Sequence, residues 1–141
     1  MKWYFASRTR HTQKLVEISK FLESKGETIL SDWVYIGMLT PFEANLKRVQ
    51  KVAIHDVEAV LNSDIFVLIS DPEGTDMFVE LGVALAKHAA KLQHVQIYIV
   101  GEYAKRSLMH LHPAIRHTST LKEVFNDVGL DYSDFEFPDL I

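Results

Sequence analysis

The chain has 141 residues, of which 48% are hydrophobic and 24% are charged, and this composition predicts one globular domain with a sizeable core. It contains no cysteine, which excludes disulfides, thiolate catalysis and cysteine-based zinc sites. A formal net charge of −4 without a Lys/Arg cluster argues against a nucleic acid polymer as the partner.

Hydrophobic periodicity and turn residues predict strands that alternate with helices. The predicted strands cover residues 2–6, 28–35, 65–69, 95–100 and 114–117. The predicted helices cover about 12–25, 42–62, a segment that begins near 76, and 119–128, with a short helix or irregular segment over 103–110. This alternation predicts an α/β fold, a flavodoxin-like parallel sheet of about five strands with helices on both faces. Residues 1–130 form the predicted domain, and 131–141 form an acidic, aromatic tail.

The stretch DIFVLISDPEGTDMFVELGVAL, residues 64–85, reads as a strand, a turn and a helix. In an open parallel sheet, such a turn lies at the edge where ligands bind. At 100° per residue, Glu80 falls on the same helical side as Met77, Val83 and Ala84, so its carboxylate borders the core. Burying an unpaired carboxylate costs several kcal/mol or shifts its pKa, so a function or a dedicated donor is expected. The alternative is an edge glutamate that reaches past the core to water.

A second carboxylate lies on the apolar side of the long helix. Asp56 falls on the line of Val49, Val52 and Val60, and the predicted inward-facing residues of this helix are Leu46, Val49, Ala53, Val57 and Val60. If the two helices converge, Asp56 and Glu80 form the nucleophile and acid pair that glycoside cleavage requires. The alternative is that Asp56 binds a local backbone donor or His55.

Several segments carry a resemblance to a known family: YFAS, HDVEAVLNSD with the following IFVLIS, and EGTDMFVELGVALA. Together they resemble the nucleoside 2-deoxyribosyltransferase superfamily, including its deoxynucleoside 5′-monophosphate N-glycosidase branch, over roughly residues 3–90. The resemblance implies a flavodoxin-like fold and cleavage or transfer at the N-glycosidic bond of a (deoxy)nucleoside or nucleotide. It assigns Glu80 as the nucleophile, Asp56 as its partner in the preceding helix, and Tyr4 as the residue that holds the Glu80 carboxylate. The alternative for Tyr4 is an ordinary aromatic on a buried strand.

The resemblance also implies that two turns contact the sugar or a phosphate. The candidate substrate-binding residues in them are Ser7, Arg8, Arg10, Asp71, Gly74 and Thr75. The first turn, SRTRHT, has no glycine where relatives place a glycine-containing phosphate loop, although arginine binds phosphate bidentately. The alternative for both arginines is a solvated, exposed turn. Trp33 and Tyr35 are candidates for stacking on a base, and core aromatics are the alternative.

The expected partner is a small nucleoside or nucleotide, with no cofactor and no metal. His110 and His112 lack a carboxylate at ligand spacing. No apolar run approaches the roughly 20 residues of a membrane span, so a cytoplasmic location is expected. Two sets of residues predict a homo-oligomer, most simply a dimer. They are the apolar tail residues Tyr132, Phe135, Phe137, Pro138, Leu140 and Ile141 and the small helical residues Gly82, Ala86, Ala89 and Ala90.

Two other classes of function fit this pattern. One is a Toll/interleukin-receptor-like NAD glycohydrolase, in which Asp76 stands where such enzymes often carry tryptophan, four residues before the glutamate. The other is a non-catalytic nucleotide-binding signalling module that keeps the pocket without the chemistry. The first class shares the sheet topology expected here and has a catalytic glutamate on the corresponding helix.

Overall fold

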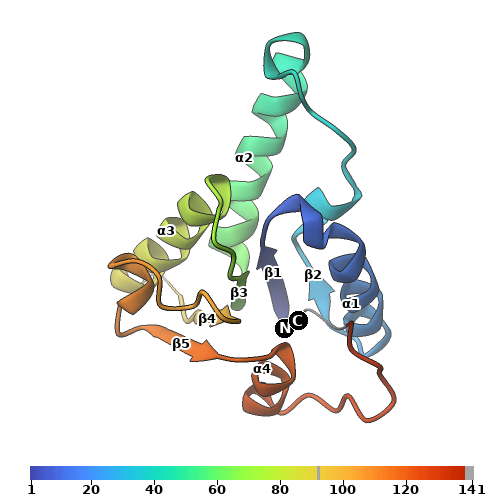
Figure 1. Ribbon diagram of the computed structural model, residues 1–141, viewed down its shortest axis with the longest axis vertical. Helices are drawn as coiled ribbons and strands as arrows, with labels where there is room; N and C mark the ends of the chain where they lie inside the picture. Colours follow the sequence, from blue (N-terminus) through green and yellow to red (C-terminus); the bar gives the residue numbers. More distant parts are fainter. Residues whose placement is uncertain (92, 139–141) are drawn as a thin grey trace.

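A computed structural model describes residues 1–91 and 93–138 and contains a five-stranded, entirely parallel sheet (Figure 1). The strands are β1 (Lys2–Ala6), β2 (Thr28–Ile29), β3 (Ile65–Ile69), β4 (Gln96–Val100) and β5 (Ile115–Thr118). The helices are α1 (Thr12–Ser24), α2 (Leu46–Asn62), α3 (Asp76–Ala89) and α4 (Leu121–Val128). The strand order is β2-β1-β3-β4-β5, which is the flavodoxin-like order and confirms the predicted fold class.

Alternate residues of the buried strands supply two separate cores. Trp3, Phe5 and Val67 face α1 and α4, whereas Tyr4 and Leu68 face α2 and α3. The sheet therefore has a pair of helices on each face, and the apolar runs of β1 and β3 are explained because both sides of these strands are covered.

The tail packs on its own chain. Phe135 stacks on Phe21 of α1 with ring centroids 4.3 Å apart, and Tyr132 and Phe137 contact Phe125 of α4. These contacts cover the tail aromatics that the sequence analysis assigned to a subunit contact, so that reason for expecting an oligomer was wrong. Two other tail residues of that prediction, Leu140 and Ile141, lie outside the described residues.

The second strand is much shorter than predicted. The ladder continues with Leu30, whose amide donates to the Trp3 carbonyl, but a 3₁₀ helix η2 (Asp32–Tyr35) follows in place of a strand. The Trp33 indole donates to the Phe5 carbonyl at 2.8 Å. A side chain thus takes an acceptor that a longer β2 would have used, and the edge position of β2 offers no second neighbour to extend it.

The predicted long helix begins with a 3₁₀ turn, η3 (Phe42–Asn45), before α2. Its predicted apolar stripe was wrong over most of its length: Leu46 and Val57 are 56% and 41% exposed, and the buried residues of α2 are Ala59 and Val60. A 17-residue helix is ~25 Å long, whereas a five-residue strand spans ~17 Å. The N-terminal half of α2 therefore extends beyond the sheet, as Figure 1 shows.

Candidate active site

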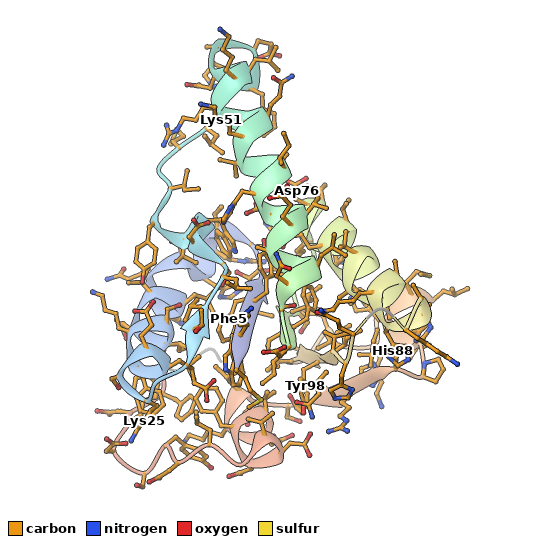
Figure 2. The ribbon with its side chains drawn as sticks, turned by 180° about the vertical axis from the view of Figure 1, so that it is seen from behind. Phe5, Lys25, Lys51, Asp76, His88 and Tyr98 are labelled. Atoms are coloured by element: carbon orange, nitrogen blue, oxygen red, sulfur yellow. The ribbon has the colours of Figure 1, made fainter. Side chains whose placement is uncertain are left out.

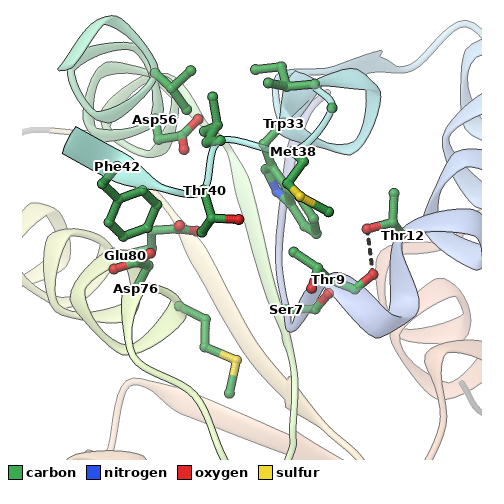
Figure 3. A pocket seen from close by; sticks show the side chains of 15 residues that line it. Ser7, Thr9, Thr12, Trp33, Met38, Thr40, Phe42, Asp56, Asp76 and Glu80 are labelled. Atoms are coloured by element: carbon green, nitrogen blue, oxygen red, sulfur yellow. Dashed lines mark hydrogen bonds between the residues drawn. The ribbon is translucent and has the colours of Figure 1, made fainter. Parts of the chain in front are cut away.

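A cavity of about 570 Å³ lies next to the ends of β1 and β3, the point at which the strand order reverses direction. Its lining comes from four parts of the chain: the β1–α1 connection, η2 with the connection that follows it, the middle of α2 and the start of α3. Figure 3 shows Asp56, Phe42, Asp76 and Glu80 on one side of it, with Ser7, Thr9, Thr12 and Trp33 across from them. Its volume is typical of a site for a small organic molecule.

The two carboxylates singled out in the sequence meet in this cavity, with Asp56 on α2 and Glu80 on α3. Tyr4 is fully buried in β1 and close enough to both carboxylates to interact with them electrostatically. Within the described part of the chain, Tyr4 Oη, Asp56 Oδ1 and Glu80 Oε2 are buried oxygens without a hydrogen-bond partner. Because buried polar atoms are normally satisfied, this group of unpaired oxygens is typical of a ligand site.

The electrostatics of the site oppose ionisation. Burial raises the pKa of Glu80 to about 8. The nearby Tyr4 hydroxyl opposes this rise in pKa, and the Asp56 carboxylate adds to the rise. Tyr4 Oη and Glu80 Oε2 have no hydrogen-bond partner in the part of the chain that the structure describes. Burial also raises the pKa of Asp56 to about 6, against the opposing effect of His55 and with a further rise from Asp32. Burial raises the pKa of Tyr4 above its ordinary value, and Glu80 and Asp56 add to the rise. Perturbed carboxylates that share a cavity are a frequent property of catalytic sites.

The alternative in which Asp56 binds His55 is not what the structure contains. His55 Nε2 lies 3.0 Å from Asp32 Oδ1 instead. This contact joins α2 to η2, the segment that carries Trp33, so it ties two walls of the cavity together.

Arg10 and Asp71, both predicted to bind substrate, bind each other. Arg10 Nε donates to Asp71 Oδ2 at 2.6 Å and Arg10 Nη2 donates to Asp71 Oδ1. Asp71 is 2% exposed, and it also accepts from the Glu73 amide and lies 3.5 Å from His11 Nε2. Burial alone would raise the pKa of Asp71, but the Arg10 guanidinium and the Glu73 amide outweigh it and hold that pKa below its ordinary value. This pair joins the β1–α1 connection to the β3–α3 connection.

The other predicted substrate-binding residues surround a smaller cavity of about 380 Å³ beside the first one. Its lining includes Ser7, Arg8, Gly74 and Thr75, and Ser7 also lines the larger cavity. Arg8 Nη1 donates to Glu73 Oε2 at 2.9 Å. Gly74 has a φ of +146°, a backbone conformation that favours glycine and lets the turn enter α3.

Several cavity residues were not singled out from the sequence. Thr9, Thr12, Met38, Phe42 and Asp76 all contribute to the lining. Met38 and Phe42 lie in or beside a connection without periodicity, which gives no sequence signal. Asp76 had one signal, since it opens the helix that carries Glu80. Of the two candidate stacking aromatics, Trp33 lines the cavity, whereas Tyr35 is exposed.

Two further properties of the described residues bear on the expected partners. Among residues 1–91 and 93–138, no group of three or more His, Asp or Glu side chains is arranged to hold a metal ion. Over the same residues, each helix is too short or too polar to span a bilayer.

The chain matches no protein-family model and no curated protein sequence. Its structure is similar to that of a CMP N-glycosidase, BcmB, from Clostridium botulinum, with a TM-score of 0.58 and 16% sequence identity over 92% of this chain and 98% of that chain. The chain has the fold of that N-glycosidase. This similarity agrees with the flavodoxin-like fold predicted from the sequence.

Proposed function

We propose that the protein is an enzyme that cleaves, or transfers at, the N-glycosidic bond of a nucleoside or nucleotide. The observation that carries the proposal is that Asp56 and Glu80, from two different helices, line one cavity with unpaired buried oxygens. The raised pKa values of both carboxyls and the similarity to the fold of an N-glycosidase support it.

The mechanism uses the two carboxyls in turn. A Glu80 oxygen attacks the anomeric carbon C1′ and forms an ester, while the bond from C1′ to the base nitrogen breaks and its electron pair leaves with the base. Asp56 gives a proton to the departing base. Water then cleaves the ester by giving its hydroxyl to C1′ and its proton to Asp56, which regenerates the Glu80 carboxylate. A second base in place of water would give transfer instead of hydrolysis.

The remaining walls fit a flat base and a hydroxylated sugar. Trp33 is fixed by its hydrogen bond to the Phe5 carbonyl, and Phe42 lies on the other side of the cavity in Figure 3, so two aromatic side chains are present for stacking. Ser7, Thr9 and Thr12 supply hydroxyl groups opposite the carboxylates. We assign Ser7, Arg8, Gly74 and Thr75 to the sugar end, and Arg10 and Asp71 to the support of the turns that carry these residues.

The test is incubation with a panel of ribonucleosides, 2-deoxynucleosides, their 5′-monophosphates and NAD, followed by chromatography for free base or nicotinamide. Release of a base from a nucleoside or monophosphate by the intact chain, and not by Glu80→Gln, is the expected result. Release of nicotinamide alone would favour an NAD glycohydrolase. Binding without release of any base would favour the non-catalytic module.

A further inference from the structure

The charge around the site is one-sided. Three carboxylates line the large cavity, namely Asp56, Asp76 and Glu80. Among the described residues that line it, none is Lys or Arg. The adjacent smaller cavity adds one guanidinium, Arg8, and shares Asp76.

The arginines near the site are already engaged by acids. Arg8 pairs with Glu73 at 2.9 Å, so a ligand anion would have to replace Glu73, which would stay nearby as a like charge. Arg10 is held by both oxygens of the buried Asp71. Arg106, the third arginine near this edge, donates to the Asp71 carbonyl at 3.0 Å and lies over the Phe78 ring. Neither Arg10 nor Arg106 lines either cavity.

The start of α3 is also occupied by negative charge. The N-terminus of a helix attracts anions through its free amides and its dipole. In this chain, Asp76 is the first residue of α3 and lines both cavities. Figure 2 shows Asp76 at the end of α3 that lies beside α2, opposite the end marked by His88. Its carboxylate therefore lies where a phosphate would need the attraction of the helix.

We infer that the substrate is a nucleoside with a free 5′-hydroxyl, and that the site discriminates against nucleoside 5′-monophosphates. This inference rests on the proposed function and specifies its substrate class. A phosphate monoester carries a charge of about −1.5 to −2 at neutral pH, which Asp76, Glu73 and the ionised member of the Asp56–Glu80 pair would repel. A bound dianion would also favour the protonated form of Glu80 and so hinder its attack on C1′. The hydroxyls of Ser7 and Thr9 suit an uncharged 5′ end.

The experiment compares kcat/KM for matched pairs, each a nucleoside and its own 5′-monophosphate with the same base and sugar. We expect the nucleoside to exceed its monophosphate by at least about tenfold at low ionic strength. Because the cause is charge, the ratio should shrink as salt is added. Asp76→Asn and Glu73→Gln should each lower the ratio by raising the value for the monophosphate, whereas Glu136→Gln, an exposed acid in the tail, should leave it unchanged.

The outcomes separate this inference from the proposed function. Equal or better cleavage of monophosphates would overturn the inference and leave the proposed function standing. If neither member of any pair is cleaved, the proposed function fails, and calorimetry with Glu80→Gln decides the inference. Tighter binding of the nucleoside would then support it, and tighter or equal binding of the monophosphate, or no binding of either, would overturn it.

Discussion

Glu80 lies in an environment that opposes its own ionisation. Its carboxyl is largely buried, Asp56 is a like charge nearby, and the compensating hydrogen bond from Tyr4 is not formed in the structure. Such an arrangement reduces the free energy of unfolding, and it is frequent where the carboxyl takes part in a reaction.

Glu80→Gln keeps the shape of the side chain and removes the nucleophile. We expect base release to fall by several orders of magnitude, since a covalent nucleophile is lost. The folded-state pKa of Glu80, about 8, is above that of an unfolded chain, so the folded protein loses stability as the pH rises from the unfolded value through about 8. The variant should therefore have a higher Tm than the intact chain at pH 8 and nearly the same Tm at pH 4. Full activity in Glu80→Gln would refute the assignment of the nucleophile.

Asp56→Asn removes the proposed acid. It should slow the cleavage of substrates with poor leaving groups more than that of activated ones, because only the former need the proton. In the intact chain the two carboxyls titrate as a pair, so kcat/KM should rise near pH 6 and fall near pH 8. In Asp56→Asn the fall at high pH should disappear, because an ionised Glu80 alone is then required. Equal slowing of both substrate types, with the fall retained, would indicate that Asp56 only positions the sugar.

At the scale of elements, the site depends on how two connections are held together. The β1–α1 and β3–α3 connections belong to neighbouring strands, and Asp71 binds Arg10 and lies beside His11 from the first connection. Since both connections line the cavities, we expect the shape of the site to depend on Asp71 although it does not line either cavity.

Asp71→Asn should lower the Tm by at least about 3 °C at pH 7, since it leaves a buried amide facing an arginine. The folded-state pKa of Asp71 is depressed, so its contribution is present above the unfolded-state pKa and is lost as the pH falls through the folded-state value. The difference in Tm should therefore shrink in acid. Asp134→Asn is the control. Asp134 forms an exposed ion pair with Lys25, and the loss of this pair should change the Tm by about 1 °C or less. Equal effects of both variants would show that Asp71 does not hold the connections together.

At the scale of the whole molecule, an apolar surface on α2 has no cover among residues 1–91 and 93–138. Leu46, Ile54, Val57 and Leu61 on α2 are between 39% and 61% exposed. Their spacing places Ile54, Val57 and Leu61 on one side of the helix. With the tail aromatics covered by their own chain, the predicted dimer now depends on this face and on the exposed small residues Gly82, Ala86 and Ala89 of α3.

A two-fold contact would bury the same α2 face on both copies, typically with ~1,200 Å² or more in total. We expect light scattering at micromolar concentration to give the mass of a dimer for the intact chain. The double change Ile54→Glu and Val57→Glu should give a monomer, whereas Leu108→Glu, at an 82% exposed position elsewhere, should not. A chain that ends at Gly129 should remain dimeric if it folds. A monomeric mass for the intact chain at assay concentrations would refute the prediction.

For one physical reason, the sequence alone determined the flavodoxin-like class of fold, the buried strands β1 and β3, and the two carboxylates that stand out from their surroundings. Residues 3–6 and 65–69 are apolar on both faces, and Asp56 and Glu80 interrupt apolar helical stripes, so periodicity by itself shows that each is out of place. The turn residues before α3 likewise fixed where that helix begins.

Only the tertiary structure decided which polar groups meet. Arg10 and Asp71 are 61 residues apart, and their pairing depends on β1 and β3 being neighbours. The truncation of β2 depends on an indole that reaches a carbonyl of another strand, and the exposure of the first half of α2 depends on its length relative to the sheet. Periodicity reports which face of an element is apolar, but not whether a neighbour exists to cover that face or which partner a charged side chain will reach.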